Sequence, residues 1–310
     1  MSRWSFDNIP DQTGRRALVT GANTGIGFET ARMLALKGAK LILCARSSEK
    51  GKAALERILA EKSDAQVSLE LIDLADLENV RTFADRLREM NIPLDLLILN
   101  AGVMVPPESK TAQGFELQFG VNHLGHFTLT GHLISLLNKR EGARVVVVSS
   151  TAALRGQMDF EDLNFEKRGY QAWPAYSQSK LANQLFTLEL QRRLRQAGSK
   201  ILVTAAHPGW TATDLQRTSP TASFFNRFVA MKPPQGALPT LRAAVDPEVK
   251  GGEYFGPHGF MQIRGYPKQV EMVGRAKSVE DAKQLWQISE DMTGVSYDLP
   301  APKSQLEERI

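Results

Sequence analysis

The sequence predicts an α/β fold: a doubly wound Rossmann domain with a mainly parallel sheet of about seven strands and helices on both faces. Short apolar, β-branched runs alternate with longer amphipathic stretches, which is the pattern of repeated βαβ units. The runs are apolar throughout, as in the four consecutive valines at 145–148. Strands of a parallel sheet have this composition because helices cover both of their faces.

The expected elements follow one another along the chain. Strands are predicted at residues 16–20, 40–45, 66–72, 94–99, 144–149 and 200–206, with a short last strand at 253–255. Helical periodicity is clearest at 79–90, 119–137 and 175–197. The pattern loosens after Thr213, and residues 214–234 mix prolines with Phe224, Phe225 and Phe228, which favours a lid over the substrate.

The simplest domain organisation is a single domain over residues 1–310. Its cofactor half spans about residues 14–150, and its catalytic and substrate half about 150–300. A chain of this length buries enough surface to fold without disulfides or metals.

Composition excludes several classes of protein. The 38 basic and 34 acidic residues give a net charge of only +4, without the basic stripe of a nucleic-acid-binding protein. The first residues carry no apolar signal segment, and no apolar run approaches the ~20 residues of a membrane helix. We therefore expect a cytoplasmic protein with no membrane anchor and no nucleic-acid partner.

Neither the cysteine nor the histidines indicate a metal site. Cys44 is the only cysteine and lies in an apolar run, so a structural role is expected. His123 and His126 lack a third ligand at a suitable spacing, and we expect them to pack within a helix.

A glycine-rich turn follows the first predicted strand, and a helical pattern follows the turn. Its residues are Thr20, Gly21, Ala22, Asn23, Thr24, Gly25, Ile26 and Gly27. Glycines at such a turn let the backbone approach a pyrophosphate, whose charge meets the helix N-terminus. The strand before and the helix after favour a dinucleotide site over an ordinary tight turn. The spacing is G-x-x-x-G-x-G.

This spacing resembles the short-chain dehydrogenase/reductase family, in its shorter-chain rather than its extended division. Further landmarks stand in the family order from about residue 14 to 257: Asp73-Leu74, Asn100-Ala101-Gly102, Asn122, Ser150, Tyr176 with Lys180, and Pro208-Gly209. The stretches at 122–127 and 176–183 look like the retinol dehydrogenase-like branch, near the WW-domain oxidoreductases. The resemblance implies an oxidoreductase that interconverts a carbonyl and an alcohol by hydride transfer.

Four residues are predicted to form the catalytic site. Hydride transfer leaves charge on the carbonyl oxygen, so the site needs a proton donor and hydrogen-bond donors there. Tyr176 and Lys180 share one helix face, and an ammonium group lowers the pKa of a neighbouring phenol. The resemblance makes Tyr176 the acid–base, with Lys180 also bonding the nicotinamide ribose. It implies that Ser150 bonds the substrate oxygen and that Asn122 holds a water linking Lys180 to solvent.

The end of the second strand predicts the cofactor. NAD-using relatives typically carry Asp where this chain has Ala45, and Arg46 follows at once. An arginine fork suits the 2′-phosphate of NADP. We expect NADP(H) to be preferred, with NAD(H) binding more weakly. By resemblance, Asp73 contacts the adenine and residues 100–102 lie against the adenosine half.

The nicotinamide end is assigned by resemblance alone. Pro208 and Gly209 are expected to shape a turn beside the nicotinamide. Thr211 and Thr213 are expected to bond its carboxamide or the phosphates.

The expected substrate is a small hydrophobic carbonyl or alcohol. The resemblance also allows a homodimer or a homotetramer. One alternative is an NADPH-binding sensor or scaffold with little turnover, which the intact Ser150, Tyr176 and Lys180 disfavour. Another is an epimerase or dehydratase of the extended division, which the glycine spacing disfavours.

Overall fold

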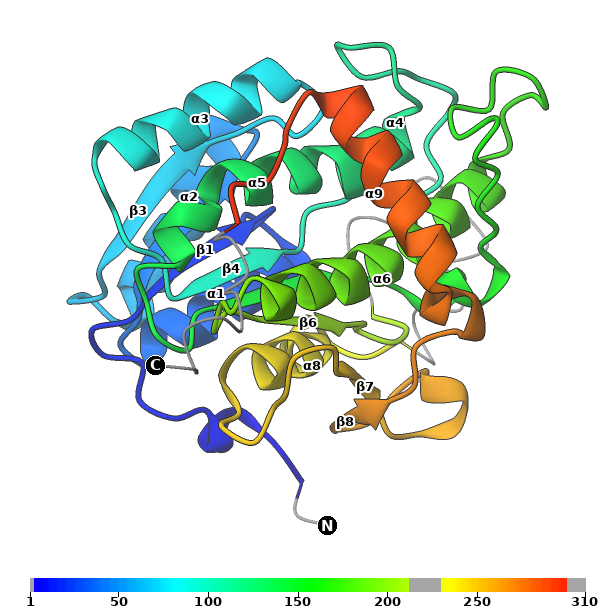
Figure 1. Ribbon diagram of the computed structural model, residues 1–310. Helices are drawn as coiled ribbons and strands as arrows, with labels where there is room; N and C mark the ends of the chain where they lie inside the picture. The colour runs from blue at the N-terminus through cyan, green and yellow to red at the C-terminus, as the bar shows by residue number, and fades with distance from the viewer. Residues whose placement is uncertain (1–2, 212–229, 300–310) are drawn as a thin grey trace, which may run out of the picture.

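The computed structural model describes residues 3–211 and 230–299, and these build one eight-stranded sheet (Figure 1). The strand order is β3-β2-β1-β4-β5-β6-β7-β8. The strands are β1 (Arg16–Thr20), β2 (Lys40–Ala45), β3 (Val67–Leu71), β4 (Leu96–Leu99), β5 (Arg144–Val148), β6 (Leu202–Ala206), β7 (Tyr254–Pro257) and β8 (Pro267–Val270). Every neighbouring pair is parallel except β7 and β8, which are antiparallel. The predicted doubly wound, mainly parallel sheet is confirmed, and β8 extends it by one strand.

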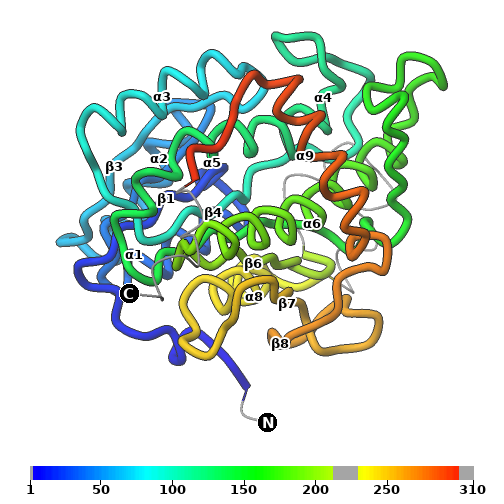
Figure 2. The backbone as a smooth tube through the Cα atoms, viewed as in Figure 1, coloured from blue at the N-terminus to red at the C-terminus, as the bar shows by residue number. Residues whose placement is uncertain are grey.

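Helices cover both faces of the sheet, as Figures 1 and 2 show. Apolar side chains of α1 (Gly25–Leu36), α2 (Ser48–Glu61) and α8 (Pro233–Val245) share one core cluster with the strands. Those of α3 (Leu77–Glu89), α5 (Gly125–Leu137) and α6 (Ala172–Gln196) form the cluster on the opposite face. Helix α9 (Val279–Thr293) packs outside α6, and Trp286 enters the core from it. The amphipathic stretches of the sequence thus bury their apolar stripes against the sheet.

The helix predicted at 119–137 is not continuous. A short α4 (Leu117–Phe119) leads into a π-helical turn over Gly120–Leu124, and α5 begins only at Gly125. A Cβ at Gly125 would lie 2.6 Å from the carbonyl oxygen of Leu74, so a larger residue would not fit there. The apolar pattern is the same in an α- or a π-turn, and hydropathy therefore could not reveal the widened turn.

Helix α6 begins at Ala172, three residues before its predicted start. Pro174 lies in its first turn. Proline is tolerated there because the first N–H groups of a helix have no intrahelical acceptor. The long helix that carries Tyr176 and Lys180 was therefore predicted correctly but placed too late.

The segment predicted as a lid lies mostly outside the described residues, as do Thr213 and the phenylalanines at 224, 225 and 228. Its last two residues, Pro233 and Pro234, belong to the first turn of α8. Among the residues that can be described, no helix is both long and apolar enough to span a bilayer.

Candidate functional site

A cleft of about 320 Å³ opens at the carboxyl edge of the sheet. Strands β2 and β4 flank β1, so the chain runs outward in opposite directions from this point. Ligands of open α/β sheets bind at such a switch point. The predicted site residues that line the cleft are Gly21, Asn23, Thr24, Gly25, Ile26, Gly27, Arg46, Asp73, Leu74, Asn100, Ala101, Gly102, Tyr176, Lys180 and Pro208.

The glycine-rich turn connects β1 to α1 at the bottom of the cleft. Gly21 and Gly25 have φ angles of 64° and 58°, which favour glycine. A Cβ on Gly27 would lie 2.3 Å from the carbonyl oxygen of Gly21, so only a glycine allows this close turn. The first N–H groups of α1 have no intrahelical acceptor and carry the positive end of the helix dipole. This turn can therefore bind an anionic phosphate.

Thr20, the last residue of β1, organises the floor of the cleft. Its hydroxyl accepts hydrogen bonds from the backbone N–H groups of Asn100 (2.9 Å) and Ala101 (3.0 Å). The same hydroxyl lies 2.9 Å from Nε2 of His126, whose Nδ1 lies 3.1 Å from the carbonyl oxygen of Asn122. A carbonyl only accepts, so Nδ1 carries the proton and the Thr20 hydroxyl donates to Nε2. His126 is thus a neutral link between β1 and the π-turn.

The two histidines of the π-turn region are both buried, and burial lowers the pKa of each to about 3. His123 lies among the rings of Phe119, Phe127 and Phe186. Their packing within the helices agrees with the sequence-based expectation.

One end of the cleft is formed by the ends of β2 and β3. Ala45 is buried and Arg46 is exposed, and both line the cleft. Asp73 is fixed from two sides, because its N–H donates to Asn79 (2.8 Å) and its carboxylate accepts from the N–H of Ala75 (2.9 Å). No carboxylate stands at position 45 to repel a phosphate.

Tyr176 and Lys180 lie at the other end, one turn apart on α6. Both side chains are buried, and Nζ of Lys180 lies 5.7 Å from the centre of the Tyr176 ring. Nζ also donates to the carbonyl oxygen of Val148 at the end of β5 (3.2 Å). Burial lowers the pKa of Lys180 to about 8. It raises the pKa of Tyr176 to about 12, and the nearby Ser150 hydroxyl opposes that rise. The sequence predicted that Lys180 lowers the pKa of this phenol; the pKa is instead raised, by burial, and Lys180 is not among the causes of the shift.

The two serines after β5 contact different groups. The Ser150 hydroxyl lies near enough to Tyr176 to influence the pKa of its phenol, and it accepts from the N–H of Ala152 (3.1 Å), but it does not line the cleft. Ser149 does line the cleft, and its hydroxyl donates to the carbonyl oxygen of Lys180 (2.7 Å). Ser149 thus fixes the backbone of α6 to the end of β5, a contact that the sequence analysis missed.

Asn122 projects from the π-turn toward α6. Its amide oxygen accepts from the N–H of Val103 (2.8 Å), and its amide nitrogen donates to Val103 and to Ser179 (2.9 Å). A Cβ added to Gly102 would lie 2.9 Å from Oδ1 of Asn122 and 3.5 Å from Nζ of Lys180. Asn122 therefore stands beside Lys180, and its role toward a water remains a prediction.

The turn after β6 contributes less to the cleft than expected. Pro208 lines it, whereas Gly209 and Thr211 do not. Gly209 has a φ of 65°, and a Cβ on it would lie 2.5 Å from the carbonyl oxygen of Ile263. Thr211 donates to the carbonyl oxygen of Pro208 (2.8 Å). Their predicted contacts with the nicotinamide remain predictions, and Thr213 lies outside the described residues.

Six lining residues were not singled out as site residues from the sequence. They are Thr20, Ile72, Val103, Val121, Val148 and Ser149, and Ala45, which the sequence analysis used only to predict the cofactor, is a seventh. Most of them end a strand or stand immediately after one, so their place in the chain was the available signal.

Comparisons with known proteins agree with this geometry. The model of the short chain dehydrogenase family matches residues 15–223. The chain belongs to this family. This short-chain dehydrogenase is 40% identical to mouse retinol dehydrogenase 12 over 92% of its length and 88% of the relative's. It is also 40% identical to human retinol dehydrogenase 13, over 94% and 88%. It is therefore a member of the retinol dehydrogenase-like branch.

Solved structures show the same fold. An uncharacterised protein from Mycobacterium paratuberculosis superposes on this short-chain dehydrogenase with a TM-score of 0.81 and 41% identity, covering 96% of this chain and all of its own. RhlG of Pseudomonas aeruginosa, solved as an NADP active-site complex, gives 0.63 and 26%, covering 82% and 96%. The short-chain dehydrogenase is thus a carbonyl/alcohol oxidoreductase, and its glycine turn and cleft fit a nicotinamide dinucleotide.

Proposed function

We propose that the protein is an NADP(H)-preferring oxidoreductase that interconverts a carbonyl and an alcohol on a small hydrophobic substrate, with Tyr176 as acid–base. The observation that carries this proposal is one cleft that begins at a phosphate-binding turn and ends at a buried phenol beside an ammonium group. Such a pairing of an anion site with a positioned proton donor is what hydride transfer to a carbonyl requires.

The residues act on the oxygen of the substrate. The bound dinucleotide supplies or accepts the hydride. Because burial raises the pKa of Tyr176 to about 12, the phenol is protonated at neutral pH and can donate its proton to an oxygen that gains charge. The Ser150 hydroxyl lies near the phenol and partly offsets the effect of burial on its pKa. Lys180, held by the carbonyl oxygen of Val148, stands behind the ring as a cation.

Preference for NADP(H) is supported at the end of β2. The exposed guanidinium of Arg46 can reach a phosphate from solvent, and its five N–H groups suit the phosphate oxygens. Ala45 offers no carboxylate to accept from a ribose 2′-hydroxyl, which is the contact that favours NAD. The relative RhlG was itself solved as an NADP active-site complex.

The substrate class is supported by the names of the relatives, which are retinol dehydrogenases. Their substrate is an apolar alcohol with a long conjugated body. We extend only its chemical class to this protein: an apolar aldehyde, ketone or alcohol.

Activity assays test this proposal directly. Purified protein is mixed with NADPH or NADH and with retinal, decanal, 2-naphthaldehyde or propanal, and cofactor oxidation is followed by absorbance. We expect turnover with the apolar carbonyls and faster turnover with NADPH. Tyr176→Phe removes the transferable proton but little volume, so turnover should fall at least ~10²-fold while NADPH binding is retained. No oxidation of either cofactor would contradict the proposal, and binding without turnover would favour a sensor or scaffold.

A further inference from the structure

An exposed tryptophan stands beside the catalytic tyrosine. Trp173, on the first turn of α6, keeps 51% of its surface accessible. Its ring centre lies 6.2 Å from that of Tyr176, with the two planes at 81°. Positions three apart on a helix share one face, so Trp173 borders the side of the helix on which the phenol lies. A large apolar surface is thus left uncovered next to the reacting group.

The start of α6 is fixed by a fully buried amide. Nε2 of Gln118, on α4, donates to the carbonyl oxygen of Ala172 (2.8 Å) and to the hydroxyl of Tyr170 (3.1 Å). Its Oε1 accepts from the N–H of Val105 (2.8 Å), and the Tyr170 hydroxyl donates to Pro106 (2.8 Å). The residue before Trp173 is therefore fastened to the segment that follows β4.

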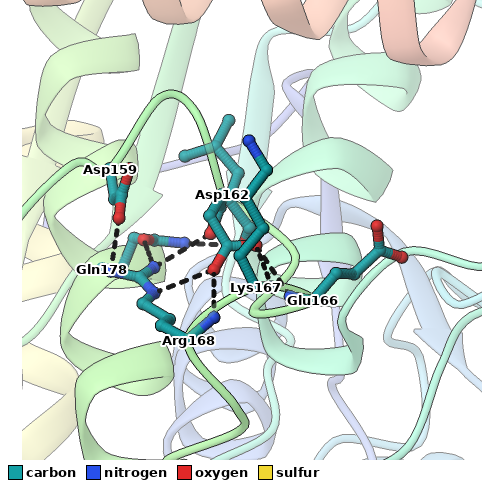
Figure 3. A network of polar contacts seen from close by, with 7 residues as sticks. Asp159, Asp162, Glu166, Lys167, Arg168 and Gln178 are labelled. Atoms are coloured by element: carbon teal, nitrogen blue, oxygen red, sulfur yellow. Dashed lines mark hydrogen bonds and ion pairs between the residues drawn. The ribbon is translucent and has the colours of Figure 1, made fainter.

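A second polar network holds the loop that precedes α6 (Figure 3). The Asp162 carboxylate accepts from the backbone N–H groups of Glu166 (2.7 Å), Lys167 (3.1 Å) and Arg168 (3.0 Å). The Arg168 guanidinium donates to the backbone oxygen of Asp162 (3.1 Å) and to Oε1 of Gln178 on α6 (2.8 Å). These hydrogen bonds join the loop to the helix.

These contacts hold the first turn of α6, and with it the exposed Trp173, in place. A helix terminus held only by its own hydrogen bonds frays, whereas this terminus is anchored through Ala172 and Gln178 on its two flanks. The indole also contributes no cleft-lining surface on the dinucleotide side. Its free face is available to a molecule that approaches Tyr176 from outside the cofactor cleft.

We propose that Trp173 is a specificity-determining residue that binds the apolar body of the carbonyl substrate while Tyr176 bonds its oxygen. This inference rests on the proposed function and makes the substrate class more definite. The preferred substrate has an extended or aromatic apolar body adjacent to its carbonyl. A small carbonyl gains nothing from the indole.

The test compares kcat/KM for decanal, 2-naphthaldehyde and propanal, with NADPH saturating, in wild type, Trp173→Ala and Trp173→Phe. Removing the indole should lower kcat/KM for the two apolar aldehydes at least about tenfold, mainly through KM, because apolar contact area is lost. Propanal turnover and NADPH affinity should change less than twofold. Trp173→Phe should keep much of the wild-type kcat/KM for the two apolar aldehydes.

Met90 provides a matched control, because it is also 51% exposed but lies at the end of α3, away from Tyr176. Met90→Ala should leave all three substrates unchanged. If wild type turns over the apolar aldehydes and Trp173→Ala does so equally well, the inference is wrong while the proposed function stands. If wild type oxidises NADPH with none of them, the proposed function itself fails.

Discussion

Burial determines the chemistry of single residues at this site. The pKa of Tyr176 is raised to about 12 and that of Lys180 is lowered to about 8, in both cases because the low-dielectric interior disfavours the charged form. A neutral phenol is ready to donate a proton at pH 7, which suits carbonyl reduction. Oxidation of an alcohol requires the phenol to lose its proton and should therefore accelerate as the pH rises.

Cofactor selectivity is tested at two adjacent residues. Arg46→Ala should weaken NADPH binding about ten- to a hundred-fold, because a charge-assisted hydrogen bond to the 2′-phosphate is lost, and leave NADH binding almost unchanged. Ala45→Asp should shift the preference toward NADH by repelling that phosphate. Titrations of both cofactors by calorimetry measure this. Added salt should reduce the difference between the NADPH and NADH affinities of the wild type, because exposed charges are screened. Equal wild-type affinities for the two cofactors would contradict the assignment.

At the scale of elements, the sequence predicted the strands better than the ends and interruptions of the helices. The bounds of β1 and β2 agree with the prediction, because each is an apolar run ended by turn residues. The π-turn was missed because it changes hydrogen bonding without changing the hydropathy pattern. Strand β8 was missed because Lys268 and Gln269 face solvent, as an edge strand allows, and no apolar run marks it.

Contacts between elements were also beyond the reach of the sequence. Gln118 and Trp173 belong to different helices, and nothing in their spacing indicates that one fixes the position of the other. The candidate catalytic residues could be predicted because they stand in the order of the family landmarks along the chain. Residues that position them act through the fold, and only the structure shows those contacts.

Gln118 tests how much one buried amide contributes to the start of α6. Gln118→Leu keeps the approximate volume but leaves the Val105 N–H without its acceptor. A buried donor without a partner costs about 1–3 kcal/mol, so the free energy of unfolding should fall by about that amount. Urea unfolding measures the change. Gln287→Leu, at an exposed position on α9, serves as the control and should have little effect. Unchanged stability in Gln118→Leu would show that its hydrogen bonds are replaced.

At the scale of the whole molecule, three buried histidines make the fold sensitive to acid. His123 and His126 have pKa values of about 3 and His207 of about 4, all lowered by burial from about 6.5. The unfolded chain binds protons below pH 6.5 and the folded chain does not. The contribution of these histidines to the free energy of unfolding is therefore complete above pH 6.5. It decreases as the pH falls from 6.5 toward their folded-state pKa values, by up to about 1.4 kcal/mol per pH unit for each histidine.

His123→Phe tests this acid sensitivity. The imidazole lies among three phenylalanine rings and its Nδ1 has no hydrogen-bond partner within the described residues, so a phenyl ring suits the position. The variant loses the hydrogen bond to Ser289 but also removes one group that the unfolded chain protonates. Its free energy of unfolding should decline less steeply between pH 7 and pH 5. A slope equal to that of wild type would mean that His123 is not held neutral by the fold.

The loop before α6 has a consequence for how such an enzyme diversifies. Residues 156–171 contribute nothing to the lining of the dinucleotide cleft, and Asp162 and Arg168 fasten them to one another and to α6. A change of sequence in this loop is therefore expected to leave the glycine-rich turn undisturbed, although the loop is joined to the helix that carries Trp173 and Tyr176. If Trp173 selects the substrate, exchanging residues 156–171 for the corresponding segment of a homologue should change the range of substrates and leave the affinity for the cofactor unchanged.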